Sequence, residues 1–366
     1  MSEKPSRDAA GVHIERIYAK GVRNLAVLDI RPGPGINLVC GGNGAGKTSL
    51  LETIYLASRA RSFRTGRLGM VGQKGSPAST VALDICSGSS DRWTQGLEWG
   101  GAGRRLRCRG AAASPAELAT ALPLEVISPE SHSLVDGAPE VRRAFLDRRL
   151  FHVEQDFWPE YRRFRKALAQ RNAALGSGAP GRSVQGWDAI LVESGERLTR
   201  WRADTVSAIT QPFKQILETL SPRLSVSLGL NTGWSEEDSL AETLVRHLET
   251  DRGRGFTGWG PHRADLKIRV ETGQAKGRVS RGQQKLIAAA LTMAAASGAG
   301  GAILLVDDLL AELDDTHAGN VVSLIENSGT QVFLTATARG RLEAMLGSAP
   351  EVFHVEHGVV KPAASS

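Results

Sequence analysis

Gly41-Gly42-Asn43-Gly44-Ala45-Gly46-Lys47-Thr48-Ser49 is the stretch that decides the fold of this chain. It fits the phosphate-loop pattern G-x-x-x-x-G-K-[ST], in which glycines let successive backbone N–H groups point at one anion. Lys47 supplies a positive charge for the β- and γ-phosphates, and Thr48 supplies a hydroxyl for Mg²⁺. We therefore expect all nine residues, from Gly41 to Ser49, to hold the phosphates of a nucleotide.

The sequence on either side of this loop supports the same interpretation. Residues 36–40 form a short apolar run after the turn residues 32–35, as expected for a buried strand. Downstream, the apolar positions Leu50, Leu51, Ile54 and Tyr55 recur at helical spacing. A strand before the loop and a helix after it are the context that a phosphate loop requires, and a chance glycine-rich turn would not need them.

Bulk composition limits the class of protein. The chain has 366 residues, 41% hydrophobic and 23% charged, which is typical of one large or two modest globular domains. It has no apolar run near the roughly 20 residues needed to span a bilayer. Residues 1–11 are polar and small, so we expect no export. The three cysteines lack metal-ligand spacing, which favours free thiols in a reducing compartment and a cytoplasmic location.

Positive charge is in excess and is clustered. The chain carries 45 Lys and Arg against 39 Asp and Glu, a net charge of +6. Any single cluster is consistent with a solvated face and local ion pairs, but we expect at least one to contact a polyanion such as DNA. The four clusters are Arg59, Arg61, Arg64 and Arg67; Arg104, Arg105, Arg107 and Arg109; Arg142, Arg143, Arg148 and Arg149; and Arg162, Arg163, Arg165, Lys166 and Arg171.

Periodicity predicts a nucleotide-binding core that is divided by a helical insertion. Alternating apolar residues predict two strands within 12–30, an antiparallel meander near 81–108 and a strand at 124–127. Helical spacing then dominates until Pro222, and the core pattern returns after 266. We expect an ATPase lobe formed by 12–127 and 256–358, a helical lobe at 128–255, and flexible termini at 1–11 and 359–366. Further elements are expected as strands at 224–230, 266–270, 303–306 and 331–335, helices at 240–248, 283–296 and 315–327, and a final helix and strand ending near Val355.

A second part of the nucleotide site is expected at Asp307 and Asp308. They follow the apolar run 302–306, which is typical of a strand buried on both faces. Asp307 is placed to hold Mg²⁺, directly or through water, and Asp308 to orient or deprotonate an attacking water. The alternative is a surface turn that carries two solvated acids.

Ser280-Arg281-Gly282-Gln283-Gln284-Lys285 opens a helix rich in alanine. Ser280 is a candidate N-cap, and with Gly282, Gln283 and the helix N-terminus it could also form a second anion site. One ATP does not need two such sites within one subunit. Two subunits placed head to tail would use each site on the partner's ATP.

Together these motifs resemble the ATP-binding-cassette heads of the structural-maintenance-of-chromosomes and Rad-fifty class. Further segments make the chain similar to the RecF family of bacterial recombination mediators over about residues 12–356. That resemblance implies an α/β fold, an ABC-type ATPase head with a mixed central sheet, flanking helices and an antiparallel β-meander, split by a mainly helical second lobe. The segments that carry it are Ser62–Thr65, Ser128–Glu130, Leu134–Pro139, Phe145–Asp147, Leu150–Val153, Gln170–Asn172, Gly260–Leu266, Ser280–Gln283, Asp307–Asp308 and Glu312–Asp314.

The resemblance also implies a function. Such proteins bind ATP and Mg²⁺, form an ATP-dependent homodimer, bind DNA at single-strand gaps and duplex junctions, and help to load recombinase in recombinational repair and replication. They hydrolyse ATP slowly, as weak DNA-stimulated ATPases, and the implied partners are RecR and RecO, with no membrane partner. The alternatives are an SMC-like clamp with another DNA-maintenance role and an ABC ATPase motor that does not act on DNA.

Residue roles follow from the matched positions. The resemblance gives Lys47 and Thr48 to the phosphate loop, Asp307 to Mg²⁺, and Asp308 to the place of a catalytic glutamate. Ser280, Gly282 and Gln283 would meet the partner's γ-phosphate. Arg64 would lie near the phosphates or DNA, and Arg23 and Asn24 near the adenine.

This chain departs from the family pattern at several positions. Arg281 stands where many cassette proteins have Gly, and Thr335 and Thr337 lie near the place of a switch histidine. These residues, with Asp308 in place of Glu, are consistent with slow turnover. Ala264 replaces an acid of the Gly260–Leu266 motif. Two interpretations of His262 and Arg263 stay open, a functional role and a structural hairpin.

Other classes of protein fit less well. A nuclease of the overcoming-lysogenisation type needs a further acidic metal domain, for which this sequence has no segment. A transporter motor needs a surface that couples to a membrane partner. A cohesin-like protein needs sustained heptads, which the insertion lacks.

Overall fold

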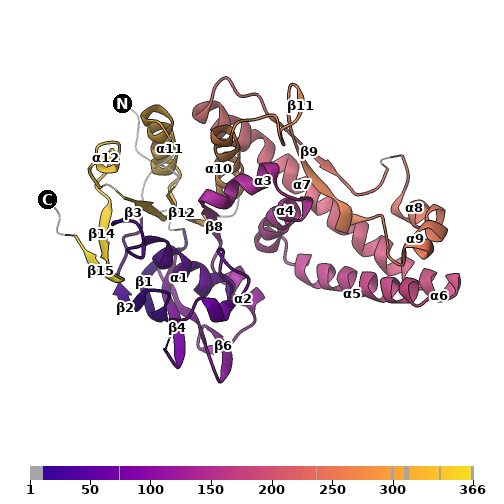
Figure 1. Ribbon diagram of the computed structural model, residues 1–366, viewed down its shortest axis with the longest axis horizontal. Helices are drawn as coiled ribbons and strands as arrows, with labels where there is room; N and C mark the ends of the chain where they lie inside the picture. Colours follow the sequence, from indigo (N-terminus) through magenta and orange to yellow (C-terminus); the bar gives the residue numbers. More distant parts are fainter. Residues whose placement is uncertain are drawn as a thin grey trace. The chain divides into compact units, whose positions relative to one another are not determined.

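The computed structural model describes residues 11–73, 75–235, 237–297, 301–308, 313–337 and 339–363. The chain divides into two units, each discontinuous in sequence, and Figure 1 labels most of their helices and strands. Unit 1 comprises residues 1–131, 219–221 and 289–366, and unit 2 comprises residues 132–218 and 222–288. Glu312, which the sequence analysis groups with Leu313 and Asp314, lies outside the described residues.

The centre of unit 1 is a six-stranded sheet with the order β15-β14-β3-β13-β12-β8. All of its pairs are parallel except β14 with β15. The four residues of β12 are buried, in agreement with the unbroken apolar run that predicts a strand covered on both faces. The strands are β3 (Ile36–Cys40), β8 (Leu124–Ile127), β12 (Ile303–Val306), β13 (Val332–Ala336), β14 (Glu351–Glu356) and β15 (Val359–Pro362).

The second sheet of unit 1 has the order β2-β1-β4-β5-β6-β7 and joins the predicted antiparallel meander, β4 to β6, to the two strands predicted within residues 12–30. Alternate residues face its core, as Val81, Leu83 and Ile85 on one strand and Trp93, Leu97 and Trp99 on the next are all buried. The strands are β1 (His13–Val22), β2 (Leu25–Ile30), β4 (Ala78–Ser87), β5 (Asp91–Gly100), β6 (Gly103–Cys108) and β7 (Ala111–Ala112).

Helix α1 (Lys47–Arg59) belongs to the hydrophobic core that both sheets of unit 1 share. Twelve of its 13 residues are buried, so this helix has no solvent-facing side. Its N-terminus is therefore held rigidly at the end of β3. The other helices of unit 1 are η1 (Leu68–Met70), α2 (Pro115–Ala121), η2 (Pro129–His132), α11 (Asp315–Asn327) and α12 (Arg339–Glu343).

Unit 2 is mainly helical and contains one three-stranded sheet with the order β11-β10-β9. The helical faces predicted from apolar spacing pack together, since Phe157, Phe164, Leu191 and Leu198 share one buried cluster. The other elements of unit 2 are α3 (Ser133–Asp136), α4 (Pro139–Val153), α5 (Phe157–Gly176), α6 (Gly181–Gln185), α7 (Asp188–Leu220), β9 (Ser227–Asn231), α8 (Leu240–Arg246), α9 (Leu248–Arg254), η3 (Pro261–Arg263), β10 (Asp265–Val270) and β11 (Gly273–Gln274). Helix α10 (Arg281–Ser297) begins in unit 2, and its residues from 289 on belong to unit 1.

Buried arginines cross-link the elements of unit 2. The guanidinium of Arg171 is fully buried and bonds Asp188 and Asp251 at 2.8 Å each. Arg142 holds Asp265 of β10 at 2.7 Å, and Arg202 holds Asp147 at 2.8 Å. Removing one partner of such a pair leaves an uncompensated buried charge, so these arginines fix how the helices pack.

The structure differs from two of the expected boundaries. Residues 256–288, which the sequence analysis places in the ATPase lobe, group with unit 2, because β10 pairs with β9 and Asp265 is held by Arg142 of α4. Residues 359–362, expected as part of a flexible terminus, form β15 and pair with β14. The expected helix at 240–248 is two short helices, α8 and α9, that meet at His247.

Gln331 offers a test of how unit 1 is held together. Its buried amide accepts a hydrogen bond from Ile14 N at 2.7 Å and donates to Ile14 O at 2.9 Å and Gly33 O at 2.7 Å. Gln331→Ala leaves buried backbone groups unpaired, which should lower the free energy of unfolding by about 2–4 kcal/mol. Urea unfolding measures this loss. The exposed Asn327→Ala should change stability by less than about 0.5 kcal/mol, and an equal effect of both variants would contradict the assignment.

Candidate nucleotide site

The phosphate loop connects the end of β3 to the start of α1, as the sequence predicts. Gly41 is required by a close approach, since a Cβ there would lie 2.3 Å from the carbonyl oxygen of Val355 on β14. Gly46 has φ 125°, a backbone conformation that side chains disfavour. Two of the glycines in the motif are thus fixed by local sterics and leave the loop curled.

Asn24, in the turn between β1 and β2, holds this loop in place. Its amide nitrogen donates to Ala45 O at 2.9 Å and to Gly44 O at 3.3 Å, and its carbonyl oxygen accepts from the Ser49 hydroxyl at 3.0 Å. From the other side, the N–H of Gly358 donates to Ala45 O at 2.9 Å. Asn24 therefore supports the loop, and its proposed place near an adenine stays a prediction.

Lys47 is 7% exposed, and its ammonium donates to Gly41 O at 2.8 Å and Gly42 O at 3.1 Å. The charge is thus held over the mouth of the loop, where the motif requires it. Asn43 and Gly42 are exposed at the tip of the loop. The N-terminus of α1 begins at Lys47, so the positive end of the helix dipole adds to this charge.

Thr48 and Asp307 meet as the sequence analysis expects. The Thr48 hydroxyl donates to Asp307 Oδ1 at 3.0 Å, and Thr335 on β13 donates to the same oxygen at 2.9 Å. The strand register explains this, because Val306 pairs with Leu334 and Ala336 pairs with Cys40, directly before the loop. The carboxyl ends of the neighbouring strands β3, β13 and β12 therefore bring together the hydroxyls of Thr48 and Thr335 and the carboxylate of Asp307.

Asp308 follows with an unusual backbone conformation. Its φ of 50° is in the left-handed region, which is uncommon for residues other than glycine. Its N–H donates to Thr335 Oγ1 at 2.8 Å, so Thr335 holds both acids. Asp308 Oδ1 is buried with no hydrogen-bond partner among the described residues. An orphaned carboxylate oxygen beside this cluster fits a site that takes a cation, a water or a nucleotide.

Burial raises the pKa of the Asp307 carboxyl above its ordinary value. The hydrogen bonds from Thr335 and Thr48 oppose the rise, Asp308 adds to it, and the charge of Arg64 opposes it. Oxygen donors of this kind, two carboxylates and a hydroxyl, are the ligands that Mg²⁺ prefers. The residues present therefore fit a magnesium nucleotide.

Arg23 and Arg64 converge on Glu52, a carboxylate that sequence reasoning missed. Glu52 is fully buried on α1, one turn after Thr48; Arg23 forms a two-pronged ion pair with it at 2.8 and 2.9 Å. Arg64 lies 3.7 Å from the same carboxylate, which also accepts from the Ser62 hydroxyl. The available signal was an acid placed between apolar residues of the sequence, Leu50 and Leu51 before it and Ile54 and Tyr55 after it. Arg64 remains 43% exposed, so it is free to reach a phosphate.

Ser280, Gly282 and Gln283 lie in unit 2, at the start of α10. Ser280 N donates to Gln283 Oε1 at 2.9 Å and Gln283 N donates to Ser280 Oγ at 3.2 Å, a reciprocal capping box. The predicted N-cap is therefore confirmed. Ser280 and Gly282 are exposed, so the cap does not occlude this helix end.

His262 has a structural environment. Burial lowers its pKa to about 4, and its Nε2 lies 3.0 Å from Thr257 O, to which the neutral ring donates. Ala264, at the position of a family acid, is buried. Arg263 lies 5.4 Å from the centre of the Phe256 ring. Of the two interpretations left open for this segment, the structure favours a structural turn.

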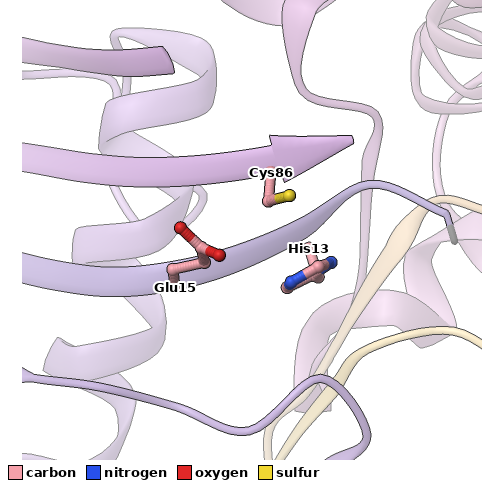
Figure 2. A group of neighbouring side chains, drawn as sticks. All are labelled: His13, Glu15 and Cys86. Atoms are coloured by element: carbon pink, nitrogen blue, oxygen red, sulfur yellow. The ribbon is translucent and has the colours of Figure 1, made fainter. Parts of the chain in front are cut away.

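A second group with metal-ligand chemistry lies on β1 and β4. Figure 2 shows His13, Glu15 and Cys86, whose ligand atoms are within 4.8 Å of one another. Each already has a partner in the protein. Glu15 pairs with Arg92 at 3.2 Å, the Cys86 thiol donates to Gly88 O at 3.3 Å, and His13 Nδ1 is 3.5 Å from Gly11 O. Local protein contacts account for this group.

The thiols agree with the sequence analysis, since Cys40, Cys86 and Cys108 are free. Burial raises the pKa of Cys40, next to the phosphate loop, to about 11, which keeps it protonated. No helix in the described part of the chain is both long enough and apolar enough to cross a membrane.

The family model described as "RecF/RecN/SMC N terminal domain" matches residues 13–361. The "DNA replication and repair protein RecF" of Thioalkalivibrio sulfidiphilus is 38% identical over 355 residues, covering 95% of this chain and 99% of the relative. This chain belongs to the RecF family. The RecF protein of Pseudomonas aeruginosa is likewise 38% identical, over 357 residues, covering 95% of this chain and 97% of its own.

Solved structures confirm the fold. The "recombination mediator protein RecF-ATP in RecFOR pathway" has a TM-score of 0.85 at 23% identity and covers 97% of this chain and 98% of its own. An Smc head bound to the C-winged helix domain of ScpA has a TM-score of 0.61 at 19% identity, covering 97% and 98%. The predicted α/β, ABC-type ATPase head is thus confirmed, shared by the RecF and SMC branches of the family.

The four arginine clusters separate into structural and exposed residues. Arg59, Arg142 and Arg171 are buried and hold carbonyls or carboxylates, so they are unavailable to DNA. The first, third and fourth clusters therefore each contain a structural arginine. Two exposed groups make no ion pair within the described ranges, namely Arg104, Arg105 and Arg107 on β6, and Arg162, Arg165 and Lys166 on α5.

The raised pKa of Asp307 predicts a trade-off between stability and function. A folded-state pKa above the unfolded value means that the ionised carboxylate destabilises the fold at neutral pH. Asp307→Asn keeps the hydrogen-bond acceptor, so it should raise the melting temperature at pH 7 by about 2–4 °C and abolish stabilisation by ATP with Mg²⁺. The difference in melting temperature between the variant and the unaltered chain should vanish as the pH falls through the pKa of Asp307 in the folded state. Thermal unfolding scans at several pH values measure this difference.

The exposed Asp204→Asn serves as the control for this scan, because its side chain is in solvent. It should leave both the melting temperature and the response to nucleotide as they are. A lower melting temperature for Asp307→Asn at pH 7 would contradict the assignment.

Proposed function

We propose that this chain is an ATP-switched DNA-binding protein of recombinational repair and replication. The observation that carries the proposal is the Thr48–Asp307–Thr335 cluster at the mouth of a complete phosphate loop. Together with membership of the RecF family, it supports ATP as ligand and DNA repair as the setting. RecF and SMC-like chains form an ATPase family, so ATP hydrolysis in general follows from membership.

The nucleotide would be held by residues of unit 1. The loop N–H groups and Lys47 would bind the phosphates, and Arg64 would approach them from the Glu52 network. Thr48 and Asp307 would hold Mg²⁺, which supplies charge neutralisation at the β- and γ-phosphates. Asp308, whose Oδ1 has no hydrogen-bond partner among the described residues, would orient the attacking water. Asp is shorter than Glu, so weak hydrolysis is part of the proposal.

A homodimer would complete the site. The capping box of Ser280 and Gln283 leaves an exposed helix N-terminus in unit 2, suited to an anion. One phosphate loop already satisfies one ATP, so the second anion site would bind the γ-phosphate on a partner copy. ATP would then join two protomers, and hydrolysis would release them.

DNA is the proposed macromolecular ligand, at single-strand gaps and at junctions of single and double strands. The net charge of +6 and the exposed cations on β6 and α5 support a polyanion. The family resemblance extends the proposal to RecR and RecO as partners and to recombinase loading. A motor that does not act on DNA has no comparable surface feature in its favour.

Dimerisation gives a direct test. Size exclusion should show a dimer with ATP and Mg²⁺ and a monomer with ADP. Lys47→Met should abolish ATP binding and dimers together, because it removes the charge over the phosphates. Ser280→Arg should keep ATP binding but prevent the dimer.

A matched control separates dimerisation from loss of the helix cap. Ser239 has the same capping box with Glu242 and is also exposed in unit 2. Ser239→Arg loses an equivalent cap, about 1 kcal/mol, and should still dimerise. Dimers of the Ser280→Arg variant, or a monomer of the unaltered chain with ATP, would remove the proposed role of Ser280.

Hydrolysis should depend on Asp308. Asp308→Asn retains a residue type tolerated at φ 50° and should leave ATP binding and dimerisation intact. Phosphate release should fall by about 100-fold, the low end of the contribution from a general base. For the unaltered chain, gapped DNA should raise the rate more than a blunt duplex of equal length. An unchanged rate in the variant would exclude Asp308 as the residue that activates water.

A further inference from the structure

Helix α5, labelled in Figure 1, has an exposed face that combines aromatic rings with cations. Trp158 is 40% exposed, and Arg162, Arg165 and Lys166 are exposed on the turns that follow. They occupy positions i, i+4, i+7 and i+8, which lie on one side of a helix. With Tyr161 they line a hollow of about 800 Å³ on the surface of unit 2.

The Trp158 ring is fixed by its neighbours. It lies nearly parallel to Tyr161, with ring centres 6.0 Å apart and an interplanar angle of 17°. Phe151 meets it edge-on at 5.7 Å, and Tyr161 in turn stacks on the buried Phe157 at 5.6 Å. An exposed aromatic held in this way loses little conformational entropy when a second flat ring stacks on it.

The cations on this face are not neutralised locally. Arg162, Arg165 and Lys166 make no ion pair among the residues that the structure describes, whereas Arg163, on the flank, is held by Glu160 and Glu193. The carboxylate of Glu160 is buried and also accepts from Arg197, so it does not offset the three free charges. The face therefore carries a net positive charge beside an open aromatic ring.

We propose that this α5 face binds single-stranded DNA, with a base stacked on Trp158 and backbone phosphates on Arg162, Arg165 and Lys166. A ring that recognises a base by stacking requires an unpaired base, since bases inside a duplex are already stacked. From Trp158 to Lys166 the helix rises about 12 Å, enough for a few successive nucleotides. The exposed cations of β6 lack this feature, because Trp93 and Trp99 on the neighbouring strand are buried.

The inference rests on the proposed function and makes it more specific, by assigning the single strand of a gap to α5. Two kinds of variant separate stacking from charge. Trp158→Ala should weaken binding of an oligo-dT strand by roughly 5- to 100-fold without changing its salt dependence, because no charge is lost. Trp158→Phe should restore most of the affinity, since a phenyl ring still stacks.

The charge variant should act on salt dependence. Arg165→Glu with Lys166→Glu removes two phosphate contacts, so the slope of log affinity against log salt should fall by about 1.4. Arg246→Glu with Arg252→Glu reverses the same charge on α8 and α9, at side chains already paired with Asp238 and Glu249. This control variant should keep a slope close to that of the unaltered chain, apart from a small effect of the change in net charge.

The experiment is fluorescence-anisotropy titration of the full chain with labelled oligo-dT and with a duplex of equal length, at several salt concentrations with ATP and Mg²⁺. Stabilisation by ATP serves as the check on folding. Selective loss of oligo-dT binding in the α5 variants supports the proposal. Unaltered oligo-dT binding, an equal loss for the duplex, or a slope change in Trp158→Ala overturns it.

The same titration distinguishes this inference from the proposed function. If the α5 variants bind oligo-dT as the unaltered chain does while the unaltered chain binds DNA, only the α5 assignment fails. If the unaltered chain binds no DNA under any condition, the proposed function itself fails.

Discussion

The nucleotide site depends on one shared oxygen, Asp307 Oδ1, which accepts hydrogen bonds from Thr48 and Thr335. Thr48 lies in α1, Thr335 in β13 and Asp307 directly after β12, and no short stretch of chain contains all three. Their meeting requires the parallel pairing of β3, β13 and β12 in one register. A slip of one residue in that register would turn Thr335 to the other face of the sheet and separate the pair. The pairing of these strands therefore places residues from distant segments of the chain in one site.

Buried charge serves a second purpose, which is to define how elements meet. In unit 1, Glu52 gathers Arg23, Arg64 and Ser62 around α1. In unit 2, Arg142 and Arg171 tie helices to β10 and to α9. A buried ion pair adds little stability over an apolar pair of the same shape, but it penalises every arrangement that separates its partners. Both units therefore use charge to specify one packing, while apolar area supplies the driving force.

Much of the site could be predicted from sequence because its parts are local. The phosphate loop, the strand before Asp307 and the cap at Ser280 each rest on a few adjacent residues, and the structure has all three. Long-range pairing could not be read in this way. Spacing alone does not reveal that β10 pairs with β9, so the sequence pattern places residues 256–288 in the ATPase lobe, whereas they belong to unit 2.

The role of a side chain could not be predicted from the sequence where the same residue type serves either in packing or in binding a ligand. Arg171 and Arg165 look alike in the sequence, yet one is fully buried and the other is exposed on the same helix. Only the direction in which each faces separates a structural arginine from a candidate ligand-binding one. The role of Glu52 was likewise not predicted, because an acid one turn after Thr48 belongs to no known motif.

The hairpin of β14 and β15 has a consequence for how the protein is made. It contributes the Val355 carbonyl that Gly41 must approach and the Gly358 N–H that holds Ala45. During synthesis the phosphate loop is made early, and the hairpin that contacts it is made late. A nascent chain can therefore contain every residue of the motif before the contacts from β14 and β15 exist. The phosphate loop gains its full set of contacts only after the β14–β15 hairpin has been synthesised.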